Sequence, residues 1–87
     1  MKLIWSTHAW ADYLWWQQND RANTRRINRM IEEIMRDPAS RGIGKPELLK
    51  GPLFAGFASR RITEEHRLVY KARADQVEIA SCRGHYT

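Results

Sequence analysis

The stretch Ser59-Arg60-Arg61-Ile62-Thr63-Glu64-Glu65-His66-Arg67-Leu68-Val69-Tyr70 contains the pattern that decides the fold. It passes from basic residues through an acidic pair to basic and then apolar residues, which predicts two β-strands joined by a tight turn. Successive side chains of a strand point to opposite faces of a sheet, so a slip of one residue would exchange the two faces. The length of the turn therefore decides where the arginines lie.

A turn of three residues after Thr63 is the better prediction for this stretch. A turn of two residues would place Arg67 beside Ile62 and bring charge to the core side. The longer turn makes one sheet face apolar, against the helices, and leaves Arg61 and Arg67 together on a basic, open face. The cross-strand pairs that it predicts are Ile62 with Leu68 and Arg60 with Tyr70.

The flanking sequence predicts three strands and a long loop. The strands are expected at about Phe57–Thr63, Arg67–Arg73 and Gln76–Arg83, with Ala74–Asp75 as a tight turn between the last two. Residues Pro38–Pro52 hold three prolines and three glycines, which predicts a loop with room for one turn of helix. A loop of this length in a small domain is often functional.

The N-terminal half predicts one strand and a helical hairpin. Lys2–Trp5 is rich in β-forming residues, and Ser6 is a suitable N-cap for a helix over Thr7–Asn19. Asp20 is expected to cap a second helix over Arg21–Arg36. The whole order is strand–helix–helix–strand–strand–strand, an α+β fold with the helix hairpin on one face of an antiparallel sheet. The apolar stripe of the second helix consists of Ile27, Met30, Ile31 and Ile34.

Length and composition limit the class of protein. The 87 residues are expected to form one domain, residues 1–87, with a small core. Fifteen Lys and Arg against ten Asp and Glu give a net charge of +5, which suits a nucleic-acid binder. Cys82 is the only cysteine in the sequence, so no internal disulfide or cysteine-based zinc site is expected, and Cys82 is predicted to be buried rather than nucleophilic. No apolar run approaches a membrane span, and a cytoplasmic location is expected.

A cluster of acidic, basic and histidine residues is suited to metal-independent cleavage of RNA. Such a reaction needs a base for the 2′-hydroxyl, cations for the phosphorane and an acid for the leaving 5′-oxygen. Glu47 is the candidate base, His85 the candidate acid, and Arg61 and Arg67 offer guanidinium forks that match phosphate oxygens. The lysines that flank the candidate base are Lys45 and Lys50.

Each candidate also has a simpler interpretation. Glu47 taken alone is better explained as a solvated loop charge, and His85 is about equally well explained as a terminal residue that packs on the sheet edge. Glu65 is expected to orient an arginine from behind the site, and His66 is expected to be a turn residue. Because two adjacent tryptophans cannot both face inward, Trp15 or Trp16 is a candidate for an interface.

The residues resemble those of the YoeB toxins of bacterial type II toxin–antitoxin systems, in the RelE superfamily. The twelve-residue stretch is the most specific part of the resemblance, which covers nearly the whole chain. The chain departs from the family pattern at Ala58, where a tryptophan is usual, at Gly84, where an aromatic residue is frequent, and at Leu48, where a proline is common. The segment Gly51–Gly56 is also one residue longer than is usual in the family. The other matching segments are Met1–Ser6, Trp10–Trp16, Gly44–Glu47 and Cys82–Tyr86.

This resemblance implies a microbial-RNase-like RelE fold and a ribosome-dependent mRNA interferase that needs no metal or cofactor. In-line attack of the 2′-hydroxyl would leave a 2′,3′-cyclic phosphate on mRNA in the ribosomal A site. The family pattern makes Glu47 the general base, His85 the general acid and Arg67 the residue that stabilises the transition state, while Tyr86 orients the substrate. The supporting or RNA-binding positions would be Lys45, Lys50, Arg60, Arg61, Glu65 and Arg83.

The resemblance also implies partners. A YefM-type antitoxin would cover the active site with its acidic C-terminal segment, and the complex would reach operator DNA only through the antitoxin. The 70S ribosome carrying A-site mRNA would be the target, the toxin would form a homodimer, and no membrane is involved. The alternatives are a non-catalytic RNA- or ribosome-binding module and a transcriptional co-repressor subunit.

Overall fold

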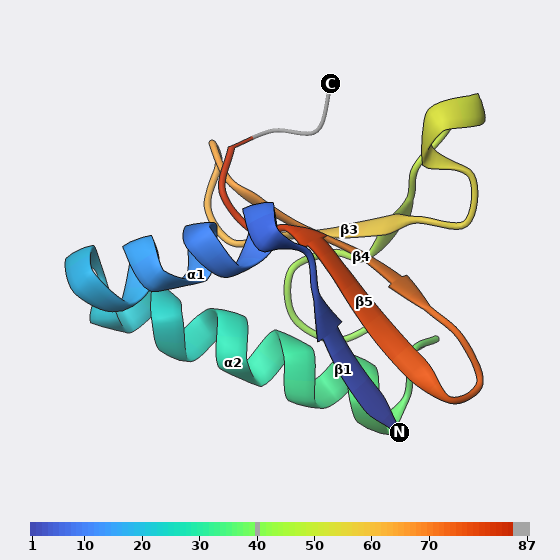
Figure 1. Cartoon of the computed structure of the whole chain (residues 1–87), viewed down its shortest axis with the longest axis horizontal. Helices are drawn as coiled ribbons and strands as arrows, with labels where there is room; N and C mark the ends of the chain where they lie inside the picture. Colours follow the sequence, from blue (N-terminus) through green and yellow to red (C-terminus); the bar gives the residue numbers. More distant parts are fainter. Residues whose placement is uncertain (40, 85–87) are drawn as a thin grey trace.

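The fold consists of a two-helix hairpin packed on one face of a five-stranded sheet (Figure 1). A computed structural model of the protein describes residues 1–39 and 41–84. Its elements are β1 (Lys2–Trp5), α1 (Thr7–Asn19), α2 (Arg21–Arg36), β2 (Glu47–Leu48), the 3₁₀ helix η1 (Pro52–Phe54), β3 (Ala58–Arg61), β4 (Arg67–Ala72) and β5 (Gln76–Ser81). The strands lie in the order β1-β5-β4-β3-β2. The predicted α+β class is confirmed, and no helix of the described ranges is long and apolar enough to cross a membrane.

Two details of the sheet differ from the prediction. β1 runs parallel to β5, whereas the other neighbouring strands are antiparallel. β1 and β5 are far apart in the chain, so no hairpin forces them to run in opposite directions. In addition, the loop over residues 38–52 contains the short edge strand β2, in which Glu47 pairs with Ser59 and Leu48 with Ala58. The two residues of β2 are too few to show a strand period in the sequence.

Both helices begin at the predicted caps. The side-chain oxygen of Ser6 accepts a hydrogen bond from the backbone N–H of Ala9 at 2.9 Å, and Asp20 accepts one from the backbone N–H of Asn23 at 3.0 Å. These bonds satisfy donors that the first turn of a helix leaves unpaired. The bond from the Asn23 backbone also lowers the pKa of Asp20.

The core lies between the helix hairpin and the sheet. The predicted stripe of α2 is buried, with Ile27, Met30 and Ile34 fully so. Burial of each such side chain contributes roughly 1.5–3 kcal/mol. The sheet and α1 complete the core with Ala9, Trp16, Ile62, Leu68, Tyr70, Val77, Ile79 and Cys82.

The turn between β3 and β4 has the predicted length but starts one residue earlier than expected. The backbone N–H of Ile62 donates to the carbonyl of His66 at 2.9 Å, so the loop is residues 63–65. Each residue of β3 therefore pairs with a residue of β4 two positions earlier than predicted. Because side chains alternate with a period of two, every side chain stays on the predicted face of the sheet. The observed pairs are Arg60 with Leu68 and Arg61 with Arg67, in place of Arg60 with Tyr70 and Ile62 with Leu68.

Candidate active site

The sheet face that turns away from the helices brings a carboxylate and two guanidinium groups together. Arg61 on β3 lies directly opposite Arg67 on β4, and Glu47 on β2 lies opposite Ser59. Ser59 and Arg61 are two residues apart on one strand, so their side chains share a face with a separation of roughly 7 Å. Glu47 therefore stands one row from the arginine pair, on the same face. The Glu47 side chain is exposed, and both arginines are half-buried.

Arg61 is held by its backbone while part of its side chain lacks a partner. Its backbone N–H donates to the carbonyl of Gly44 at 2.6 Å. Its own carbonyl accepts two bonds from the guanidinium of Arg26, at 3.3 and 3.0 Å. The side-chain Nε of Arg61 is buried and has no hydrogen-bond partner among the residues described. A buried donor beside a second cation favours an incoming anion, since two like charges directly opposite destabilise a sheet.

The turn itself orients Arg67. Its Nη1 donates to the carbonyls of Thr63, Glu64 and His66, at 2.7, 3.0 and 3.2 Å. Glu65, which was expected to orient an arginine, forms no ion pair within the described part of the chain. Three backbone carbonyls of the tight turn hold the guanidinium and the Glu65 side chain is exposed, so the supporting role of Glu65 stays a prediction. The remaining N–H groups of Arg67 stay available for a ligand.

His66 fastens the segment that leads to the C-terminus. The backbone N–H of Gly84 donates to Nδ1 of His66 at 2.8 Å, which places the ring proton of a neutral imidazole on Nε2. The ring of His66 also meets the ring of Trp16 edge-on at 5.0 Å. The Gly84 carbonyl accepts a bond from the backbone N–H of Arg67 at 3.0 Å. His66 is thus an anchor rather than only a turn residue, and the sequence offered no signal for its contact with a residue eighteen positions away.

The predicted acid and the tyrosine beside it, His85 and Tyr86, lie outside the described residues, as do Ser40 and Thr87. The chain is described as far as Gly84, which has a positive φ of 85°. The contacts of Gly84 with His66 and Arg67 place this last described position next to the arginine pair.

Arg60 is a correction to the predicted RNA-binding set. Its side chain is fully buried on the helix side of the sheet, where burial excludes direct contact with RNA. Nη1 forms an ion pair with Glu33 on α2 at 2.8 Å and donates to the carbonyl of Ile43 at 3.3 Å. Nε donates to the hydroxyl of Tyr70 at 3.2 Å. A buried arginine needs such partners, and sequence charge alone did not reveal them.

The same ion pair holds the loop that carries Glu47. Glu33 also accepts a bond from the backbone N–H of Ile43 at 3.2 Å. Gly44 then follows with φ of +90°, and a Cβ there would meet Arg60 and Met30 at 2.9 Å. Only glycine combines that backbone conformation with such a close approach. The loop is therefore clamped onto α2 and β3 a few residues before Glu47, while Lys45 and Lys50 are exposed on it.

The side chain of Arg83 lies against α1. Its guanidinium is 3.8 Å from the centre of the Trp15 ring, a cation–π contact. Trp16 is buried, and its ring N–H donates to the carbonyl of Cys82 at 2.7 Å. Of the two adjacent tryptophans, Trp16 is therefore excluded as an interface residue, and Trp15 stays a half-buried platform for Arg83.

Cys82 is buried, as predicted, immediately after β5. Burial and the nearby Asp12 carboxylate raise the pKa of its thiol to about 12. The backbone N–H of Cys82 donates to Asp12 at 3.0 Å. A thiol that stays protonated is a poor nucleophile. Within the described ranges, no three His, Cys, Asp or Glu side chains are grouped as a metal site.

Comparison with known proteins extends over the whole fold. The sequence model of one family, described as "YoeB-like toxin of bacterial type II toxin-antitoxin system", matches residues 5–86. The YoeB toxin of Escherichia coli K12 is 55% identical over 86 residues, which are 99% of this chain and 100% of the relative.

Two solved structures from Staphylococcus aureus are also similar, each at 45% identity and covering 99% of this chain and 98% of theirs. One is a YoeB dimer, with a TM-score of 0.89. The other is a heterotetrameric YoeB–YefM toxin–antitoxin complex, with a TM-score of 0.87. Full-length matches at this identity show the family as well as the fold. The chain belongs to the YoeB-like toxins of bacterial type II toxin–antitoxin systems.

Proposed function

We propose that this toxin is a ribosome-dependent endoribonuclease that cleaves mRNA in the ribosomal A site and so inhibits translation. The observation that carries the proposal is the shared sheet face of Glu47, Arg61 and Arg67. A carboxylate can take a proton there while two guanidinium groups compensate the charge that develops on a phosphate. The unpaired Nε of Arg61 supports the same interpretation, since a phosphate oxygen would satisfy it.

The proposed reaction is a transesterification within the RNA. Glu47 removes the proton of the 2′-hydroxyl, and the 2′-oxygen attacks the adjacent phosphorus in line. Arg61 and Arg67 stabilise the phosphorane through charge-assisted hydrogen bonds. His85 donates a proton to the 5′-oxygen as its bond to phosphorus breaks, with Tyr86 orienting the substrate. The products are a 2′,3′-cyclic phosphate and a 5′-hydroxyl, and no metal or cofactor takes part.

The proposed regulator is a YefM-type antitoxin. The S. aureus relative is solved in complex with YefM, and an acidic C-terminal antitoxin segment would complement the basic sheet face and cover the active site. Operator DNA would be contacted by the antitoxin of that complex.

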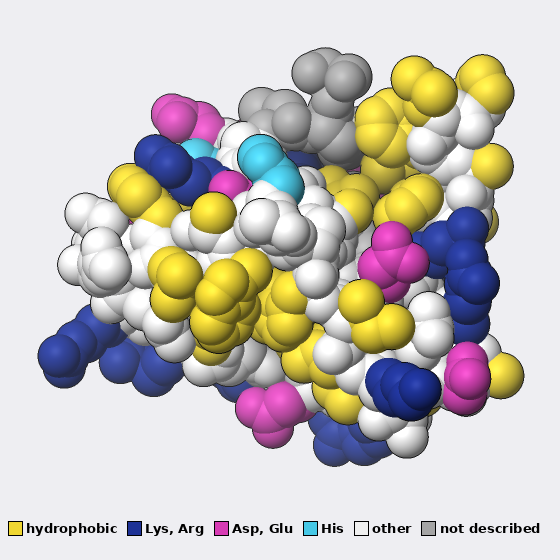
Figure 2. All heavy atoms as spheres, in the orientation of Figure 1, with side chains coloured by type: hydrophobic (Ala, Val, Ile, Leu, Met, Phe, Trp, Pro, Cys, Tyr) yellow, Lys and Arg dark blue, Asp and Glu magenta, His cyan; other side chains and the backbone are white. Residues whose placement is uncertain are grey.

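A homodimer is proposed through an apolar surface on α1 and β1. Trp5, Trp10 and Tyr13 form an aromatic cluster with ring centres 4.8–6.0 Å apart. Trp10 is 46% exposed and Leu14 is 38% exposed beside it. Figure 2 shows hydrophobic side chains gathered over this part of the molecule, and exposed apolar clusters of this kind mark interfaces. The interface tryptophan in this proposal is Trp10, whereas the sequence predicted Trp15 or Trp16.

The proposed function is tested by primer extension on an mRNA translated in a purified system, with and without ribosomes. We expect breaks at A-site codons with wild-type protein, only when ribosomes are present, and fragments that end in a 2′,3′-cyclic phosphate. His85→Ala should abolish the breaks. If wild-type protein binds ribosomes and leaves the mRNA intact, the protein is a binding module instead, and the nuclease proposal fails.

A further inference from the structure

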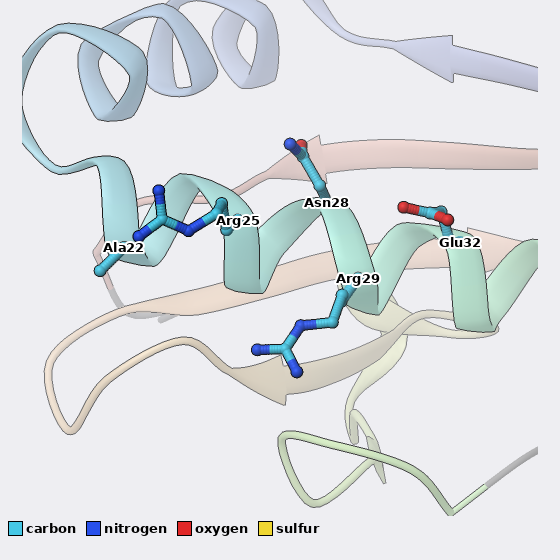
Figure 3. Close-up of a pocket in the computed structure, with 5 residues that line it drawn as sticks. All are labelled: Ala22, Arg25, Asn28, Arg29 and Glu32. Carbon is cyan, nitrogen blue, oxygen red and sulfur yellow. The ribbon is translucent and has the colours of Figure 1, made fainter.

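A row of arginines on the exposed side of α2 takes no part in the proposed reaction. Arg21, Arg25 and Arg29 are spaced by four residues, which places them on one helix face. Arg36 falls on the same face at the end of α2, since each residue turns the helix by about 100°. All four are exposed, and they form the α2 arginine row. Two of them border a shallow hollow of about 640 Å³, which is lined by Ala22, Arg25, Asn28, Arg29 and Glu32 (Figure 3).

This row is unfavourable for the isolated helix. Like charges four residues apart repel one another, and Arg21 stands in the first turn, where the positive end of the helix dipole disfavours a cation. The N-cap Asp20 stands beside Arg21 and Glu32 shares the face between Arg29 and Arg36, so the face of α2 carries four arginines against one glutamate. Across the described residues, neither ion pair involves the row. Arg26, on another side of α2, is the arginine that serves the fold, through the carbonyl of Arg61.

The geometry of the row suits phosphate groups. Four residues of helix rise by about 6 Å, and the row from Arg21 to Arg36 extends for about 22 Å. Figure 3 shows the guanidinium groups of Arg25 and Arg29 both leaning toward the N-terminal end of α2. Guanidinium forks bind phosphate oxygens with two parallel hydrogen bonds, which a lysine cannot do. Every cation of the row is an arginine.

We propose that the α2 arginine row is a docking surface for the phosphate backbone of structured RNA. α2 covers the sheet face opposite to that of Glu47, Arg61 and Arg67 (Figure 1), so the row binds a different RNA strand from the one that is cut. This step rests on the proposed function: mRNA lies on the sheet face, and ribosomal RNA lies along α2. The row then accounts for part of the ribosome dependence, because docking delivers the sheet face to the A site.

An acidic polypeptide fits the row less well. Disordered acidic segments that fold on a partner gain stability mainly by burying apolar side chains. The hollow offers Ala22 as its only apolar lining residue, beside arginine, asparagine and glutamate side chains. Guanidinium forks that follow one helix face over about 22 Å are better matched by the phosphates along an RNA helix.

The test compares two full-length variants of equal charge, neither of which changes Glu47, Arg61 or Arg67. Arg25→Gln/Arg29→Gln removes two members of the row, and Lys2→Gln/Arg73→Gln removes two exposed cations elsewhere. Binding to salt-washed 70S ribosomes and to a 20-base-pair RNA duplex is measured from 50 to 300 mM KCl. Two phosphate contacts account for a slope of about 1.5–2 in log affinity against log salt. At 150 mM we therefore expect the row variant to bind about 10–30-fold more weakly and the control within about threefold of wild type.

Each outcome decides the proposal. Equal losses in both variants would mean that only net charge matters, and would overturn it. An unchanged affinity for ribosomes together with lost binding of a synthetic glutamate-rich peptide would assign the row to an acidic polypeptide, and would also overturn it. The proposed nuclease is judged separately, because cleavage is scored with wild-type protein. If wild-type protein binds through the row without cutting mRNA, the docking surface stands and the nuclease fails.

Discussion

Replacing Glu33 by Gln removes the charge that pairs with the fully buried guanidinium of Arg60. Removal of one partner from a buried ion pair costs about 3–5 kcal/mol, because the other charge stays buried without compensation. The side chain of Glu33 is 24% exposed and glutamine retains an acceptor, so we expect the lower end, about 3 kcal/mol. For a domain of this size that corresponds to a fall in Tm of roughly 12–24 °C.

Thermal and urea unfolding, followed by circular dichroism, measure this change. Glu32→Gln is the matched control, since Glu32 is the exposed neighbour and belongs to neither ion pair of the described residues; its effect should stay within about 0.5 kcal/mol. The double variant Glu33→Gln/Arg60→Met should be far less destabilised than the sum of its single variants, because it leaves no buried unpaired charge. Two results would refute the clamp that we assign to this pair. One is a double variant whose loss of unfolding free energy equals the sum of the two single losses; the other is a decrease in Tm of less than about 4 °C for Glu33→Gln.

Three further predictions concern the site, the thiol and the apolar surface. Arg67→Lys keeps the charge but loses the fork that the turn carbonyls hold, and should slow single-turnover cleavage about 100-fold; a change below threefold would contradict the assigned role. Cys82 has a folded pKa of about 12 against an ordinary 9.0, so the folded state binds its proton more tightly. The protonated thiol should therefore contribute its full stabilisation below pH 9, and this stabilisation should disappear as the pH rises toward 12. Thiol reagents should not label Cys82 at pH 8 unless the protein is unfolded. Trp10→Ser should convert the proposed homodimer to a monomer in analytical ultracentrifugation without unfolding it, and a dimer that persists would place the interface elsewhere.

The helices were predictable because their signals are local. A cap side chain bonds to a residue three positions on, and the stripe of Ile27, Met30, Ile31 and Ile34 repeats within one helix. The faces of β3 and β4 were predictable for a similar reason, since alternation and an odd turn length determine them even though the partners moved by two positions.

The errors arose where distant segments meet. Arg60 was counted as an RNA contact because of its charge, although the predicted alternation already placed it on the helix side; its partner Glu33 is 27 residues away. The parallel pairing of β1 with β5 and the edge strand β2 likewise depend on packing between remote parts of the chain. The role of His66 depends on Gly84. None of these contacts leaves a local pattern, so the sequence located the cluster of chemical groups but not the scaffold behind it.

The most direct test of the proposed active site is the single-turnover rate at which Glu47→Gln cleaves mRNA on programmed ribosomes. Glu47 is exposed, so its replacement should leave folding intact, and Glu64→Gln serves as the control at an exposed glutamate that forms no ion pair within the described chain. Loss of a general base should slow cleavage by about 10²–10⁴-fold, while the control cleaves at the wild-type rate. A Glu47→Gln variant that cleaves within threefold of wild type would contradict the proposed chemistry of this sheet face.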